Sequence, residues 1–215
     1  MRRARSAGPG GFGAYLSARA GYFAFFTALF VVAVGFGAAA VRALSEAQKA
    51  ELLDYLEVYL RGLGRSMPAT PGSELWYQAV SASLRTAALL WASGLVALGL
   101  LLAPAVVFMR GFVVGFAVGF LTHELGMRGI LLATLAVFPQ NLLSVPATLV
   151  IATASSSYSL SILRRRGSRA GAGRVNVAGY TIIVLAMMAL LVLAATIEAY
   201  VAPVFMRLIS GYGGG

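Results

Sequence analysis

The sequence contains no cysteine and only one histidine, His123. Without cysteine the chain can form no disulfide framework, and it offers no thiolate as a metal ligand or nucleophile. A single histidine also excludes metal sites that need a histidine pair in one chain, such as the H-E-x-x-H motif. We therefore predict no catalytic, cofactor-binding or metal-binding residues and no enzymatic activity.

Charged residues are also scarce, at 11% of the 215 residues, whereas 60% are hydrophobic. Soluble globular domains carry about 25% charged and about 45–50% apolar residues. The composition predicts an all-α, polytopic integral membrane protein with one membrane domain over residues 1–215. Because the arginines gather in loops, we assign the net charge of +10 to membrane orientation and anionic lipid, not to nucleic acid.

Five hydrophobic segments are predicted to span the membrane, since one crossing takes about 20 apolar residues in a helix. They cover residues 22–41, 86–108, 111–125, 129–163 and 177–201. The fourth segment holds no charged residue over roughly 50 Å of helix at 1.5 Å per residue, which is too long for one straight crossing. We expect it to break at Pro139 and Pro146, and we expect Pro203 to close the fifth.

Two segments carry arginines without acidic neighbours, the N-terminal tail (1–21) and the loop 164–176. Their basic residues are Arg2, Arg3, Arg5, Arg19, Arg164, Arg165, Arg166, Arg169 and Arg174. Loops rich in lysine and arginine stay on the cytoplasmic side. The N-terminus is therefore predicted to be cytoplasmic, and the C-terminus and the charge-balanced loop 42–85 extracytoplasmic.

An amphipathic helix is predicted over residues 45–63 of that outer loop. Ser45 is followed three residues later by Gln48, which is a capping-box pattern. Apolar residues then recur at helical spacing. They include Leu52, Leu56, Tyr59 and Leu63. Two interpretations remain open: the helix packs on its own spans or on lipid headgroups, or it docks an extracytoplasmic partner.

Gly111, Gly115 and Gly119 recur every four residues in the third segment. Small residues at this spacing let a second helix approach closely, because lipid gives helices no hydrophobic drive to associate. The run therefore predicts a helix-packing seam, either within one chain or between two copies in a homodimer.

Pro139, Gln140 and Asn141 place a proline and two amides inside an apolar segment. Proline removes a backbone donor, and polar groups at membrane depth need protein or a water-filled cavity around them. Three interpretations remain open: a kink satisfied by neighbouring spans, a transport or gating site, or an intramembrane seam for a partner.

Glu198 is an ionisable residue inside the fifth segment, which makes it a candidate functional residue. Its expected neighbours are His123, Glu124 and Arg128, because the fifth segment ends on their side. A pair with Arg128 would be structural, so structural and functional roles remain open for Glu198. His123 and Glu124 are predicted to form an outer turn, with a proton-linked pair as the alternative.

Three motifs together resemble the stage II sporulation protein M family: the G-F-x-x-G-F run, the P-Q-N triplet and the E-A-x-x-A-P ending. The similarity extends from the first span and the 45–63 helix to the VAPVFM stretch. As motif positions it carries over to Gly115, Gly119, Pro139, Gln140, Asn141 and Glu198, none of them catalytic.

The resemblance implies a non-enzymatic scaffold for engulfment during sporulation, in the mother-cell membrane at the septum. It implies that the scaffold localises stage II sporulation proteins D and P, which degrade peptidoglycan. The alternative is a permease-like subunit with a broken-helix site, coupled to an ATPase or an ion gradient.

Overall fold

The computed structural model describes residues 19–65, 71–166 and 177–211, and the regular structure in these ranges is helical. The helices are α2 (Ala20–Ala40), α3 (Glu46–Arg65), α4 (Pro71–Leu95), α5 (Gly99–Leu132), α6 (Phe138–Arg166) and α7 (Val177–Gly211). A 3-10 turn η1 (Val41–Ala43) follows α2, and a π-helix η2 (Ala133–Val137) precedes α6. Arg2, Arg3, Arg5, Arg169 and Arg174 lie outside the described ranges.

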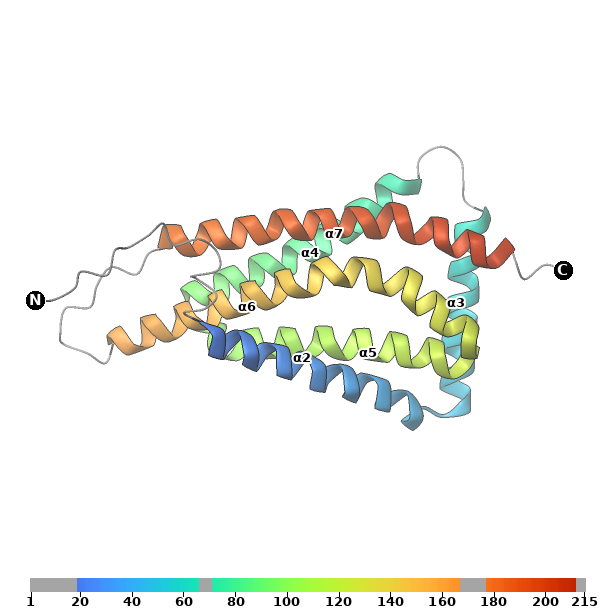
Figure 1. The fold of residues 1–215 in the computed structure, drawn as a ribbon, viewed down its shortest axis with the longest axis horizontal. Helices are drawn as coiled ribbons and strands as arrows, with labels where there is room; N and C mark the ends of the chain where they lie inside the picture. The colour runs from blue at the N-terminus through green and yellow to red at the C-terminus, as the bar shows by residue number, and fades with distance from the viewer. Residues whose placement is uncertain (1–18, 66–70, 167–176, 212–215) are drawn as a thin grey trace, which may run out of the picture.

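Helices α2, α4, α5, α6 and α7 run lengthwise in one bundle, and α3 lies across one end (Figure 1). We call this the α3 end, and we call the opposite end the basic end because Arg19 and Arg164 lie there. Helices α2, α5 and α7 run from the basic end to the α3 end, and α4 and α6 run back. This arrangement confirms the predicted all-α membrane bundle.

Four of these helices are long and apolar enough to cross a membrane. The candidate spans are Ala20–Ala43, Gly99–Leu131, Phe138–Arg164 and Val177–Ile197. Helix α4 runs beside them but is less apolar, since it carries Gln78, Arg85 and several serines. In an 18-residue window of the span on α6, 61% of the residues are buried, whereas the share is 22% in each of the other three spans, so α6 is the central helix of the bundle.

The predicted bounds of the second and third spans are wrong. The helix is interrupted after Leu95, and the backbone of Ala97 has a left-handed φ of 66°. Residues 86–95 therefore end α4, and residues 99–108 open α5. This turn could not be predicted from the sequence, because residues 95–102 are uniformly small or apolar and contain no polar loop residue.

The predicted breaks at Pro146 and Pro203 are also wrong, whereas directly before Pro139 the helix changes from π to α without ending. The chain turns instead at Gly126, whose φ of 55° is easily adopted only by glycine. A side chain at Gly129 would overlap the carbonyl of Leu121, so the backbones on the two sides of this turn are in close contact. Pro139 follows the wider π-helix η2, while α6 continues through Pro146 and α7 through Pro203 to Gly211.

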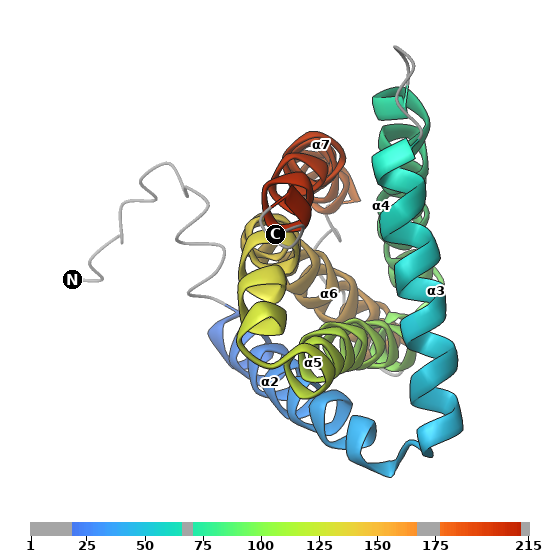
Figure 2. The ribbon, with the colours of Figure 1, turned by 90° about the vertical axis from the view of Figure 1, so that its right-hand side faces the viewer.

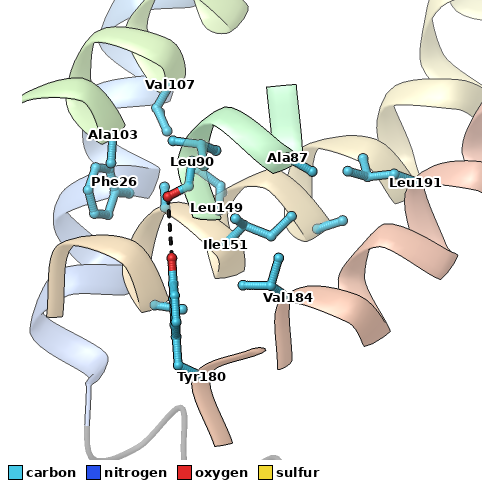
Figure 3. Packing of buried hydrophobic residues seen from close by; sticks show 13 residues of the cluster. Phe26, Ala87, Leu90, Ala103, Val107, Leu149, Ile151, Tyr180, Val184 and Leu191 are labelled. Carbon is cyan, nitrogen blue, oxygen red and sulfur yellow. Dashed lines mark hydrogen bonds between the residues drawn. The ribbon is translucent and has the colours of Figure 1, made fainter. Parts of the chain in front are cut away.

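The apolar core forms where α4, α5, α6 and α7 converge, and α2 contributes Phe26 (Figure 3). Its largest fully buried side chains are Phe26, Leu90, Val107, Ile151, Val184 and Leu191. Many other large apolar side chains point outward, as expected of a bundle whose outer surface contacts lipid.

The glycine seam packs α5 against α2 of the same chain. Added side chains would meet Phe30 and Ala33 at Gly111, Val34 at Gly115, and Ala38 at Gly119. On the opposing helix, a side chain at Gly37 would overlap the backbone of Phe112. The structure therefore uses these glycines for packing within one chain, and a homodimer would need another surface.

Candidate functional site

Arg110 is a charged residue in the interior of an apolar helix. It lies eleven residues after Gly99, or roughly 16 Å along α5. The predicted spans 86–108 and 111–125 leave Arg110 between them, so the sequence alone does not identify it as a residue inside a helix. Charged residues at membrane depth are costly and mark functional sites by default, because they are retained only where they interact.

A cavity of about 490 Å³ lies beside Arg110, between α4, α5 and the η2–α6 junction. We call it the lateral groove. Its lining is Thr86, Leu89, Val106, Met109, Arg110, Val113, Val114, Ala117, Val137, Gln140 and Asn141. Leu89, Met109 and Val113 are exposed, so the groove opens at the bundle surface. It combines apolar walls with one guanidinium and two amides.

The P-Q-N triplet contributes to this groove through both amides. The Nδ2 of Asn141 donates a hydrogen bond to the carbonyl of Val137, at 2.8 Å. Val137 is the last residue of the π-helix, where the helical hydrogen-bond ladder changes. Asn141 therefore supports the π-helix and also lines the groove beside Gln140.

We expect Asn141→Ala to lower stability by about 1 kcal/mol, because the carbonyl of Val137 loses its side-chain donor in a water-poor environment. For a chain of this length the expected fall in apparent Tm is about 2–4 °C, measured in detergent. The control is Thr134→Val: the Thr134 hydroxyl is exposed and bonds only one turn back, to Ile130. An unchanged midpoint for Asn141→Ala would contradict this role.

A second polar cluster, which we call the hydroxyl cluster, lies near the basic end. Its members are Ser93, Ser155, Ser156, Ser159 and Tyr180, all buried. Ser155 donates to the carbonyl of Leu90 at 2.8 Å, Ser159 to that of Gly94 at 3.1 Å and Ser156 to that of Gly99 at 3.0 Å. Tyr180 donates to the carbonyl of Trp91 at 2.9 Å.

The serine bonds attach the last part of α4 and the start of α5 to the central helix α6, and the Tyr180 bond attaches α4 to α7. Gly94 lies in the last turn of α4, where backbone carbonyls lack helical partners and need other donors when they are buried. The serine run from Ser155 to Ser161 inside an apolar segment is the sequence signal for this cluster, but it was not among the predicted site residues. The hydroxyl cluster therefore donates hydrogen bonds to backbone carbonyls and holds the backbone around the α4–α5 turn in place.

At the α3 end, Ser45 and Gln48 form the predicted capping box. The Ser45 backbone donates to Gln48 Oε1 at 2.9 Å, and the Gln48 backbone donates to Ser45 Oγ at 3.3 Å. A hydrogen bond from Lys49, at 2.8 Å, and the Lys49 charge lower the pKa of the Glu46 carboxyl. His123, near the end of α5, also lowers the pKa of Glu46, so α3 begins beside the end of α5.

The remaining predicted residues lie near the same end. His123 Nδ1 and Glu124 Oε1 are 2.8 Å apart, on helix α5 rather than in a loop turn. Arg128 is exposed just beyond the Gly126 turn. Glu198 lies on α7, but its side chain is outside the described part of the structure, so its pairing with Arg128 stays a prediction.

The docking face predicted on α3 stays a prediction, and the described part of the helix shows other exposed apolar side chains. Leu52 is half-buried, and the side chains of Leu56, Tyr59 and Leu63 lie outside the described part. Tyr55 and Val58 are 75% and 63% exposed. These two neighbours on the helix surface are apolar groups that the described residues leave uncovered.

Comparison with known proteins gives one family. The family model described as stage II sporulation protein M matches residues 26–203. No curated protein and no solved structure matches. The matched range includes α3, the lateral groove and the hydroxyl cluster.

Proposed function

Because the chain belongs to the stage II sporulation protein M family, we propose that this sporulation membrane protein is a non-enzymatic scaffold of the engulfment machinery. It recruits peptidoglycan-degrading partners, stage II sporulation proteins D and P, and localises them at the septal membrane. In this proposal its contribution is binding and positioning, and the partners supply the hydrolytic chemistry.

The observation that carries this proposal is the position of α3. The helix lies across one end of the bundle, and Arg19 and Arg164 lie at the other. By the positive-inside rule the basic end is cytoplasmic, which places α3 and the end of α7 outside, on the side of the cell wall. Tyr55 and Val58 then offer exposed apolar side chains to an extracytoplasmic partner. Exposed aromatic residues are favoured anchors at protein interfaces.

We expect the double substitution Tyr55→Ser with Val58→Ser to reduce the recovery of these hydrolases about tenfold, since one or two anchors commonly dominate binding energy. The measurement is quantitative co-purification in mild detergent from cells fixed during engulfment. Both side chains are exposed, so membrane insertion and yield should be unchanged.

The matched control changes two exposed acidic residues of the same helix, Glu51→Ser with Asp54→Ser. This variant should retain the hydrolases, because its changes leave the apolar pair intact. Full recovery with the Tyr55 and Val58 variant would contradict recruitment through this face of α3.

One observation favours a second candidate function, a permease-like subunit. The lateral groove places Arg110 and Gln140 together inside the bundle, and polar groups near the membrane midplane form substrate sites in transporters. The same co-purification tests this alternative: a cytoplasmic ATPase recovered without hydrolases would support it over the scaffold.

A further inference from the structure

We propose that the lateral groove binds a transmembrane helix of a partner protein through a carboxylate on that helix, which pairs with Arg110. This inference deepens the scaffold function and rests on it for the partner's role. It assigns to the scaffold a second contact, inside the membrane, in addition to the face of α3 outside it.

The charge in the groove specifies the chemistry of the occupant. The Arg110 guanidinium carries five N–H donors and remains ionised in proteins. A guanidinium with five donors can serve an acceptor of its own chain and also a second acceptor from a partner. The amides of Gln140 and Asn141 lie in the same lining, so the polar side of the groove can donate to both oxygens of one carboxylate.

The shape of the groove fits a helix that enters from the membrane. Its walls are mostly valine, leucine, methionine and alanine. Its exposed rim at Leu89, Met109 and Val113 lets an apolar surface approach from the side. Transmembrane helices associate through close packing and interhelical polar contacts, and this surface provides both.

The depth of Arg110 distinguishes a helix from a lipid headgroup. Arg110 lies roughly 16 Å along α5 from Gly99, so a hydrocarbon core of about 30 Å that begins near Gly99 has Arg110 close to its midplane. Lipid phosphates lie at the membrane interface, whereas a helix side chain can sit at the midplane. A carboxylate at that depth therefore belongs to a protein segment.

The groove and α3 lie on the same side of the molecule. Viewed from the α3 end, α4 and α5 lie apart, and α3 crosses on the side where they separate (Figure 2). A single-pass partner seated between α4 and α5 would emerge beside α3. The two contacts are therefore compatible with one bound protein.

The test uses a model helix in place of a natural partner. The full-length chain is reconstituted in phosphatidylcholine–phosphatidylglycerol vesicles and labelled at a cysteine introduced by Tyr77→Cys, which is unique because the natural sequence has none. The probe is a labelled leucine–alanine transmembrane peptide with one central glutamate, and the reference peptide has leucine at that position. Energy transfer between the labels reports binding.

We expect the glutamate peptide to bind about tenfold more tightly than the leucine peptide, the order expected for one or two interhelical polar contacts. Arg110→Gln should reduce its affinity to that of the leucine peptide. Val113→Trp should block the groove and weaken both peptides. The matched control, Val31→Trp, changes a similarly exposed valine on α2, outside the groove, and should bind as the unmodified chain does.

Equal affinity for the two peptides would overturn the inference, and so would normal binding by Val113→Trp if Arg110→Gln does not fold. The inference is also overturned if the unmodified chain binds neither peptide and the Arg110→Gln variant loses co-purifying phosphatidylglycerol. That result would identify the groove as a lipid site. Because the assay contains no hydrolase, its failure leaves recruitment through α3 standing. Conversely, the Tyr55 and Val58 variant of α3 should bind the peptide normally even if it no longer recruits hydrolases.

Discussion

The substitution Gly37→Ala is expected to destabilise the bundle by about 2–3 kcal/mol, a typical cost of overpacking a close-packed contact. The added methyl group would overlap the carbonyl of Phe112 and lie 2.7 Å from the backbone nitrogen of Phe116. Both obstacles are backbone atoms of α5, so no side chain can move aside. Helices α2 and α5 would have to separate along their shared glycine seam.

The control for Gly37→Ala is two residues away on the same helix. A methyl group at Gly35 meets nothing within 4 Å. Alanine favours helix over glycine by about 0.8–1.0 kcal/mol, so Gly35→Ala should be neutral or stabilising. Thermal unfolding in detergent measures both variants, with an expected fall of about 4–12 °C for Gly37→Ala alone. Equal midpoints would show that the two helices are not as closely packed as the structure places them.

The second large effect is expected from Ser159→Leu at the hydroxyl cluster. Ser159 is fully buried and donates to the carbonyl of Gly94. Its hydroxyl oxygen lies where a side chain on Gly99 would otherwise be, so three extra carbon atoms have no space. Overpacking and the lost hydrogen bond together should cost about 2–4 kcal/mol. We expect the α4–α5 turn to detach from α6.

A matched serine tests this explanation. Ser161 is exposed, and its hydroxyl bonds only to the carbonyl of Ser157 on its own helix. Ser161→Leu should therefore retain the yield and melting midpoint of the unmodified chain. Limited proteolysis at the α4–α5 turn provides a second measurement, because only Ser159→Leu should expose it. Similar behaviour of the two leucine variants would argue against a structural role for the hydroxyl cluster.

The sequence predicted the features that depend on local pattern. Apolar runs predicted a helical membrane bundle, and the Ser45–Gln48 spacing predicted the capping box that begins α3. The glycine repeat indicated a packing seam, but only the structure shows that α2 forms its other side. Spacing on one helix reveals a face, whereas the partner of that face depends on tertiary structure.

The errors came from positions where tertiary contacts outweigh local preference. Ala97 adopts a left-handed turn inside an apolar run, and hydroxyl groups from α6 satisfy the helix end beside it. Because a charge is costly in lipid, the prediction places Arg110 between two spans, yet α5 continues through it. Pro139 seemed to end a helix, but the preceding π-helix accommodates it. Rules that consider one segment of sequence at a time cannot predict these contacts with other parts of the chain.

The seam between α2 and α5 also determines the order of events during biosynthesis. Gly37 meets the backbone of Phe112, about 75 residues later in the chain, and α3 and α4 are synthesised in between. At about 5–20 residues per second, translation of that interval takes roughly 4–15 s. Throughout it the first inserted helix has no α5 to contact. The close packing of α2 against α5 is therefore a late step of assembly, and the rate of translation determines when this step can begin.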